Sequence, residues 1–215
     1  MLEVIPTVLT NDPQELKQLI NQAEEAAERV QIDVIDGQFA ENKTVDPNVF
    51  QTVETNLKLD FHLMTKEPVG WVERVVRVMA DRIIGQIEMM QSQVEFVEKV
   101  MENGVLVGLG VDLDTPVSKL DLEVLTKLDV VLLMSVPAGF GGQKFDKKVI
   151  EKVKTLEKTR KKEKLNFRIC IDGGVTLEVV RNLVDAGADE VSVGRLLYKG
   201  DLKENIQKFK EMAEK

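Results

Sequence analysis

The chain has 215 residues, of which 43% are hydrophobic and 31% charged, enough to bury most of the unfolded surface in one large domain or two small ones. The formal net charge of −8 at pH 7 argues against nucleic acid and anionic membrane surfaces as partners. No apolar stretch approaches the roughly 20 residues that cross a bilayer. The single cysteine, Cys170, excludes a disulfide within one chain, so we expect a soluble, cytoplasmic protein.

Short apolar runs typical of β-strands recur along the chain and alternate with longer amphipathic stretches. The predicted strands are residues 2–9, 29–35, 58–64, 82–88, 106–111, 130–136, 167–172 and 190–194. A helix is expected in every gap between them. Asp12 and Pro13 provide a helix start after the first strand, and Gly187 provides a helix end before the last.

Eight strand-then-helix units in this length predict a single (β/α)8 barrel, a TIM barrel that forms one domain over residues 1–215. The alternative is an open, doubly wound sheet, which predicts a main glycine fingerprint after the first strand. Here the first strand is followed by TNDPQ, and the glycines come later. In a barrel, the carboxyl ends of all strands meet at one mouth, so polar residues at these ends are expected to converge there.

Two of these strand ends carry a carboxylate: Asp33 in IDVIDG and Asp172 in IDGG. Moving a proton between the two faces of a carbon beside a carbonyl needs a base on one side and an acid on the other, and Asp33 and Asp172 can provide them. An isolated Asp-Gly is as often a loop or helix cap. Asp36, which begins a turn, and Asp60, in the middle of a strand, are assigned structural roles.

His62, in LDFHLM, also lies at a strand end. The enediolate formed by such proton removal needs a metal ion or fixed hydrogen-bond donors near its negative charge. An imidazole with two carboxylates is a suitable ligand set, although a lone histidine on an apolar strand is more often a satisfied core residue. The string GFGGQ at residues 139–143 is either a flexible loop or a row of N–H groups that binds a phosphate. The charged run KTRKKEKLN, at residues 158–166, is expected to be a solvated helix end and loop.

Taken together, the strings IPTVLTND, IDVIDGQF with AENKT, DFHLM, LMSVPAGFGGQKF, CIDGGV and AGADEVSVG resemble the ribulose-phosphate 3-epimerase family over nearly the whole chain. The resemblance implies a barrel of the ribulose-phosphate-binding type that interconverts D-ribulose 5-phosphate and D-xylulose 5-phosphate. It implies that Asp33 and Asp172 are the acid/base pair and that both ligate a divalent metal with His62. The substrate-binding residues implied by the resemblance are Thr7, His62, Gly139, Phe140, Gly141, Gly142, Gly173, Gly174, Gly194 and Arg195.

The chain departs from the family at several of these positions. Gln31 stands where the family has a second metal-binding histidine, Gln86 where it has a histidine on the fourth strand, and Arg195 where it has a serine in the last phosphate loop. A glutamine oxygen is a weaker ligand than imidazole, so we expect Gln31 to be at most a weak fourth ligand for Zn, Mn, Fe or Mg, with reduced zinc affinity. Arg195 either adds a charge-assisted donor to the phosphate or faces solvent.

Two alternatives stay open at this point. One is a 3-epimerase that acts on a hexulose 6-phosphate, because relatives of this fold use the same phosphate loops. The other is a metal-poor barrel that binds a phosphosugar without turning it over, as the glutamines at 31 and 86 suggest. The expected partner is a small phosphorylated sugar, with no nucleic acid and no membrane, and association into a homo-oligomer through helix faces is compatible with the sequence.

Overall fold

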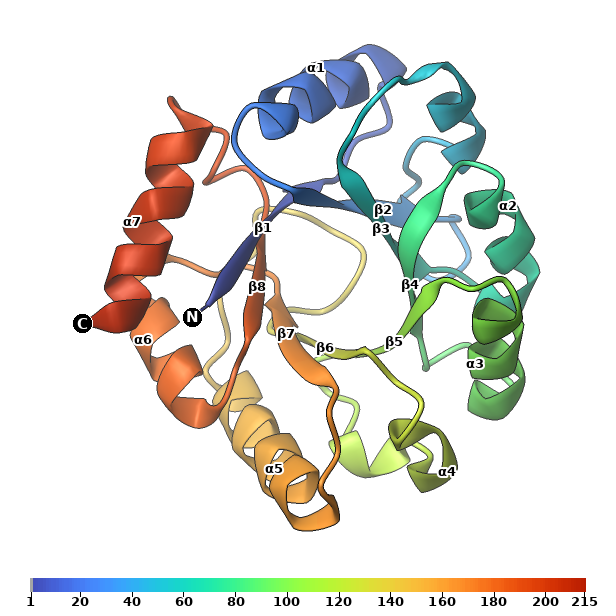
Figure 1. Ribbon diagram of the computed structural model, residues 1–215, viewed down its shortest axis with the longest axis vertical. Helices are drawn as coiled ribbons and strands as arrows, with labels where there is room; N and C mark the ends of the chain where they lie inside the picture. The colour runs from blue at the N-terminus through green and yellow to red at the C-terminus, as the bar shows by residue number, and fades with distance from the viewer. Residues whose placement is uncertain (1) are drawn as a thin grey trace.

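The strands of this protein close into one parallel barrel, seen along its axis in Figure 1. The computed structural model describes residues 2–215. The strands are β1 (Glu3–Val8), β2 (Arg29–Ile35), β3 (Lys58–Met64), β4 (Ala80–Gln86), β5 (Leu106–Val111), β6 (Val130–Met134), β7 (Arg168–Asp172) and β8 (Glu190–Val193). The barrel closes where β8 pairs with β1 and Ser192 lies opposite Ile5. The predicted (β/α)8 barrel is confirmed, and the open doubly wound sheet is excluded.

Helices surround the barrel on its outside (Figure 1). They are α1 (Pro13–Glu24), α2 (Val72–Val76), α3 (Gln93–Glu102), α4 (Leu122–Leu125), α5 (Lys148–Glu163), α6 (Leu177–Ala186) and α7 (Leu202–Glu214). The carboxylate of Asp12 accepts a hydrogen bond of 2.8 Å from the N–H of Gln14, which fixes the start of α1. Gly187 ends α6 with φ of 113°, a conformation that favours glycine. Both ends are as the sequence predicts.

The expectation of a helix in every gap is wrong between β2 and β3. This connection holds only a 3₁₀ turn, η1 (Pro47–Thr52). Asp36 at its start accepts hydrogen bonds from the N–H groups of Gln38 and Phe39, so the chain enters a tight turn instead of a helix. Short 3₁₀ turns, η2 (Pro68–Trp71) and η3 (Val117–Lys119), also precede the short helices α2 and α4.

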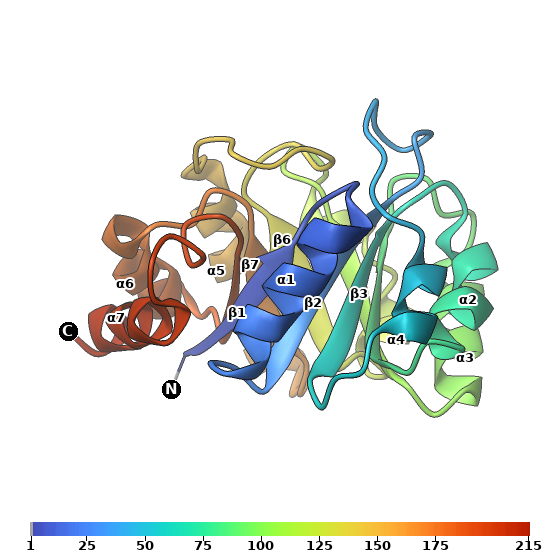
Figure 2. The same ribbon diagram turned by 90° about the horizontal axis from the view of Figure 1, so that it is seen from above.

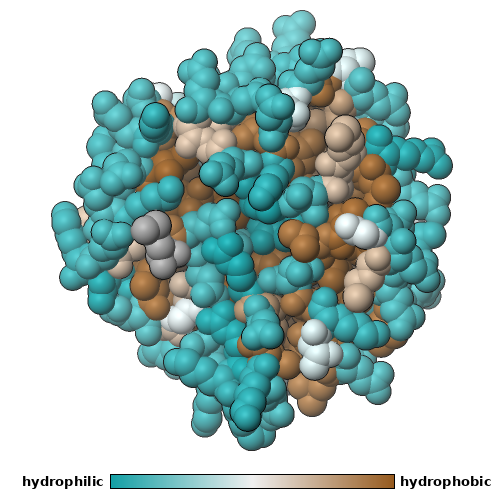
Figure 3. All heavy atoms as spheres, viewed as in Figure 1, coloured by the Kyte–Doolittle hydropathy of each residue, from teal (hydrophilic) through white to brown (hydrophobic). Residues whose placement is uncertain are grey.

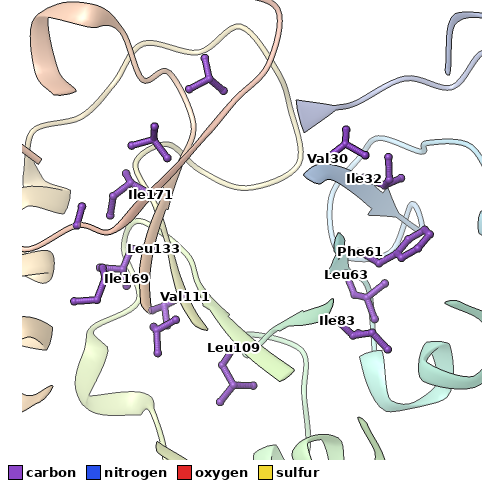
Figure 4. Packing of buried hydrophobic residues seen from close by; sticks show 14 of the residues in the cluster. Val30, Ile32, Phe61, Leu63, Ile83, Leu109, Val111, Leu133, Ile169 and Ile171 are labelled. Atoms are coloured by element: carbon purple, nitrogen blue, oxygen red, sulfur yellow. The ribbon is translucent and has the colours of Figure 1, made fainter. Parts of the chain in front are cut away.

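Side chains alternate between the two faces of each strand, so the barrel has two apolar cores. The larger core lies between the strands and the helices, where residues such as Phe61, Leu63 and Ile171 point away from the barrel axis (Figure 4). The smaller core fills the barrel interior and comprises Ile84, Val130, Leu132, Met134, Val136 and Cys170. This interior packing leaves polar groups to the two ends of the barrel.

Buried charges fill the amino end of the barrel. Arg82 on β4 reaches Asp60 on β3 at 2.5 Å and Glu190 on β8 at 2.8 Å. Arg29 also pairs with Asp60, and Arg168 lies 3.0 Å from Glu190. These pairs join strands on different sides of the barrel, which agrees with the structural role predicted for Asp60.

The loops that follow the carboxyl ends of the strands lie together at the opposite end, the barrel mouth (Figure 2). Hydrophilic side chains cover most of the face that Figure 3 shows, with smaller apolar areas between them. Within residues 2–215, none of the helices has the length and apolar character needed to cross a membrane.

Candidate active site

Polar side chains from three strands meet inside the barrel near its mouth. Gln31 and Asp33 both point inward from β2 because they are two positions apart, His62 comes from β3, and Asp172 ends β7. Nδ1 of His62 lies 3.2 Å from Oδ1 of Asp33 and 3.6 Å from Oδ2 of Asp172. All four residues are buried. The structure therefore brings together the three predicted metal ligands and Gln31.

The side-chain amide of Gln31 links these groups. Its Nε2 donates to Oδ1 of Asp33 at 2.9 Å and to Oδ2 of Asp172 at 2.6 Å, and it lies 3.4 Å from Nδ1 of His62. Its Oε1 accepts a hydrogen bond of 2.7 Å from Oγ of Ser192 on β8. The residue that departs from the family pattern thus occupies the centre of the hydrogen-bond network.

The protonation of this cluster follows from burial and from the close carboxylates. Burial raises the pKa of Asp33, although its hydrogen bond with His62 opposes the shift. Burial alone would lower the pKa of His62, but its hydrogen bonds with Asp172 and Asp33 outweigh that effect and raise the pKa to about 9. Without a metal, the imidazole is therefore protonated on both nitrogens near pH 7, and its positive charge compensates the charge of the neighbouring carboxylates. Its Nε2 has no hydrogen-bond partner within residues 2–215, so His62 is not a fully satisfied core histidine.

The spacing of these atoms fits a divalent cation. The ligand atoms of Asp33, His62 and Asp172 all lie within 4.8 Å of one another. Metal–ligand bonds of about 2.0–2.2 Å place neighbouring ligand atoms roughly 2.8–3.6 Å apart. Nδ1 of His62 lies 3.2 Å from Oδ1 of Asp33 and 3.6 Å from Oδ2 of Asp172, which agrees with this spacing. Two carboxylates and an imidazole are a chemically suitable set, so these residues can hold a metal ion.

Three loops beside this cluster carry the predicted phosphate-binding residues. They follow β6 (Gly139–Gly142), β7 (Gly173 and Gly174) and β8 (Gly194 and Arg195). Gly174 has φ of 60°, and a Cβ there would lie 2.5 Å from the N atom of Phe145, so a side chain would collide with the end of the first loop. No hydrogen bond within residues 2–215 engages the N–H groups of Gly141 or Gly142, which leaves these donors available to an anion.

Arg195 lies beside this glycine loop. A Cβ built on Gly142 would lie 3.6 Å from one guanidinium nitrogen of Arg195, and one on Gly141 would lie 4.0 Å from the other. The side chain is exposed but leans over the loop. Phe140 of the same loop is 49% exposed. Thr7 is buried at the end of β1, and its Oγ1 has no hydrogen-bond partner within residues 2–215.

Sequence reasoning missed three polar residues that hold the site in place. The Oγ of Ser135 donates to the backbone oxygen of Asp172 at 2.9 Å. Asn42 donates from Nδ2 to the backbone oxygen of Gly139 at 2.7 Å, which ties the β2–β3 connection to the glycine loop. Ser192 holds Gln31. The alternation of Glu190, Ser192 and Gly194 along β8 was the available signal that Ser192 points into the barrel.

Gln86 is not part of the hydrogen-bonded cluster. It is buried at the end of β4, and neither of its side-chain polar atoms has a hydrogen-bond partner within residues 2–215. Within the residues that the structure describes, Gln86 therefore forms no hydrogen bond with the three candidate ligands.

A closed (β/α)8 barrel that buries two carboxylates and an imidazole beside a glycine-rich loop has the groups that an acid/base enzyme needs. The sequence profile of the Ribulose-phosphate 3 epimerase family matches residues 3–198. The chain belongs to that family, and it is therefore an isomerase. The resemblance seen in the sequence motifs is confirmed.

Known relatives agree with this assignment. The chain is 34% identical over 215 residues to the ribulose-phosphate 3-epimerase of Bacillus subtilis (strain 168), covering 98% of this chain and 99% of that protein. It is 32% identical over 201 residues to the enzyme of the same name from Treponema pallidum (strain Nichols), covering 92% of each. A solved 3-hexulose-6-phosphate synthase superposes with a TM-score of 0.71 over 98% of this chain and 99% of that one, at 12% identity. That last likeness shows the shared fold alone.

Proposed function

We propose that this protein interconverts D-ribulose 5-phosphate and D-xylulose 5-phosphate by moving a proton at C3. The observation that carries the proposal is the pair Asp33 and Asp172, held at the ends of β2 and β7 by one amide group of Gln31. The names of the relatives support the pentulose substrate. They do not favour a hexulose 6-phosphate, and the paired carboxylates do not favour a barrel that only binds a phosphosugar.

Each carboxylate serves one face of C3. For one epimer, a carboxylate removes the C3 proton, and the electron pair of the C–H bond forms the enediolate. The other carboxylate, protonated beforehand, donates its proton to the opposite face and becomes the base for the reverse reaction. Burial raises the pKa of Asp33, which helps this carboxyl group to hold a proton between turnovers.

The negative charge of the enediolate needs donors that are already in place. Without a metal, the N–H groups of Gln31 and the protonated Nδ1 of His62 lie in the space between the carboxylates and are the donors nearest to it. A divalent ion held by Asp33, Asp172 and the deprotonated imidazole of His62 would take the place of these donors and supply positive charge beside the enediolate oxygens. We propose Zn, Mn, Fe or Mg as this ion, bound more weakly than by a site with a second histidine in place of Gln31.

The phosphate of the substrate binds to the N–H groups of Gly141, Gly142 and Gly174 and to the guanidinium of Arg195. This local positive focus is needed because the whole chain carries a net charge of −8. Within the same proposal, Thr7 offers a free hydroxyl to the sugar. The surrounding loops are shaped by Gly139, Phe140, Gly173 and Gly194. We place the enzyme in the cytoplasm.

Solvent deuterium exchange at C3 tests the proposed reaction. The enzyme is incubated with ribulose 5-phosphate in D2O, with and without added Mn²⁺ or Zn²⁺, and deuterium at C3 is followed by NMR. We expect incorporation at C3 together with formation of xylulose 5-phosphate. The same measurement with a hexulose 6-phosphate gives the exchange rate for comparison. Binding without exchange in every metal condition would contradict the epimerase proposal, and faster exchange with the hexulose would move the substrate to the longer sugar.

A further inference from the structure

The amide of Gln31 has partners of opposite character on its two sides. On the inner side, Nε2 faces two carboxylate oxygens at 2.9 and 2.6 Å. On the other side, Oε1 accepts a hydrogen bond of 2.7 Å from the hydroxyl of Ser192. The residue is fully buried, so each polar atom of the amide depends on these neighbours for its hydrogen bonds.

This orientation suits the cluster without a cation and is unsuitable with one. Two carboxylates that face each other across a small space are stabilised by an NH2 group with two protons. A metal ion in the same space binds the oxygen of an amide, because the lone pair of the amide nitrogen is delocalised into the carbonyl group. The two ends of a glutamine amide have nearly the same shape, so a half-turn of the group exchanges them at little steric cost.

Such a half-turn requires that the residue on the side away from the carboxylates can both donate and accept a hydrogen bond. Ser192 meets this requirement, because a hydroxyl has one proton and two lone pairs. With Oε1 outward, Ser192 donates to Gln31, as observed. With Nε2 outward, Ser192 would accept from Gln31 and direct its own proton elsewhere. The thiol of Cys170 lies 3.4 Å from this hydroxyl, and either atom of that contact can be the donor.

We propose that the Gln31 amide rotates by a half-turn when a divalent cation binds, so that its oxygen becomes a reversible ligand. Ser192 and Cys170 form the hydrogen-bond chain that permits this rotation. In the cation-free protein, the chain of donors runs from Cys170 through Ser192 to Oε1 of Gln31. In the loaded protein, it runs from Nε2 of Gln31 through Ser192 to the sulfur of Cys170. Ser192 is thus a positioning residue, and this inference rests on the metal site of the proposed function.

NMR of the side-chain amide observes the orientation directly. The protein is labelled with 15N and 13C, and the Gln31 NH2 signals are assigned by their loss in a Gln31→Met variant. Without metal, we expect no strong nuclear Overhauser effect between these protons and the Ser192 β-protons. With saturating Zn²⁺, we expect a strong effect to the Ser192 β-protons and a changed shift of the Gln31 Cδ. If the amide signals stay unchanged while calorimetry shows that Zn²⁺ is bound, the proposed rotation of the Gln31 amide is wrong.

A double-mutant cycle tests Ser192. Ser192→Ala leaves the outward NH2 group of the loaded state without an acceptor, whereas in the cation-free state it removes a donor from a single carbonyl oxygen. Buried N–H groups tolerate the loss of a partner less well than carbonyl oxygens, so Zn²⁺ binding should weaken about five- to tenfold. In the Gln31→Met background, Ser192→Ala should leave the Zn²⁺ dissociation constant unchanged. Equal effects in both backgrounds would show that Ser192 does not act through Gln31.

The outcomes separate this inference from the proposals on which it rests. If calorimetry detects no Zn²⁺ or Mn²⁺ binding, both the metal site and the reversible ligand are wrong. Deuterium exchange at C3 still reports on the epimerase independently, because that measurement does not depend on the orientation of the amide. If metal binds and the amide keeps Nε2 inward, only the present inference fails.

Discussion

The side-chain nitrogen of Gln31 lies 2.6 Å from Oδ2 of Asp172, a residue 141 positions further along the chain. The same nitrogen reaches Asp33 at 2.9 Å. In the metal-free protein, one neutral group therefore fixes the spacing of both proposed acid/base residues across the barrel. Because the amide comes from the body of a strand instead of a loop, the two carboxylates are held in place before a substrate arrives.

Replacement of either carboxylate by its amide should abolish epimerisation. Asp33→Asn and Asp172→Asn keep the shape of the side chain but remove its ability to exchange a proton. Phosphate affinity should stay within roughly tenfold of wild type, about 1.4 kcal/mol, because the phosphate loops are untouched. Turnover and inhibition by inorganic phosphate measure the two effects. Near-normal turnover in either variant would refute the assignment of that residue.

Arg195→Ser should weaken the binding of sugar phosphates. A charge-assisted hydrogen bond to the phosphate contributes about 1.5–3 kcal/mol, and this is the loss expected in the inhibition constant of a substrate analogue. Lys199→Ser is a matched control, because it removes the same charge from an exposed residue four positions later in the chain. Equal effects of the two substitutions would show that only overall charge matters.

Gln31→His should strengthen zinc binding by a factor on the order of 10 to 100, since imidazole is the better ligand for this ion. The wild-type protein, as purified, should contain less than one metal ion per chain and lose zinc readily to a chelator. Metal analysis and competition with a chelator measure both quantities. A full and chelator-resistant metal content in the wild type would mean that Gln31 does not weaken the site.

The stability of the metal-free protein should fall as the pH rises from about 6.5 towards 9. The pKa of His62 is about 9 in the folded protein, above its ordinary value of 6.5, so the folded state binds the proton more tightly than the unfolded state. The resulting stabilisation is fully present below pH 6.5 and is lost through pH 9. Urea unfolding should show a decline on the order of 1–3 kcal/mol that is absent in His62→Asn. A parallel decline in both proteins would assign it to other groups.

Arg82→Met should destabilise the protein by about 3 kcal/mol. The substitution leaves the buried carboxylates of Asp60 and Glu190 short of a partner at the amino end of the barrel. Lys99→Met is the control, because it breaks an ion pair with Glu73 at the surface, where the two side chains are 35% and 58% exposed, and it should cost much less than Arg82→Met. Urea unfolding measures the free energy of unfolding of each variant, and the comparison holds when the steepness of the transition is unchanged. Similar losses would show that burial of the pair is unimportant.

The strands were predictable because apolar runs of this length, between polar segments, have few other stable states. The β4 strand is the main exception: it covers Ala80–Gln86 instead of residues 82–88. Its start is extended by pairing of Ala80 with Leu59 next to a register shift in β3, which sequence cannot show. The connection between β2 and β3 has no α-helix because Asp36 holds a tight turn at its start. The regular alternation of strands and helices elsewhere led to the prediction of a helix here.

The site was predictable in part. Asp33, His62 and Asp172 follow apolar strands, and parallel strands place such residues at one mouth. The orientation of the Gln31 amide and the contact with Ser192 could not be predicted, because they depend on distances between residues far apart in the chain. The space around Arg195 is likewise a property of the folded loops. Its position beside Gly142 supports the interpretation of Arg195 as a phosphate donor, which stays a prediction.

The contact between Gln31 and Ser192 joins the second strand to the last, across 161 positions. It forms only when β8 has taken its place beside β1. A chain that has collapsed around its outer apolar core but has not closed the barrel therefore lacks the complete site. During refolding, activity returns only when the barrel is closed, whereas far-ultraviolet circular dichroism follows the helices whether or not the barrel has closed. Any delay between the two signals therefore measures the time that barrel closure takes.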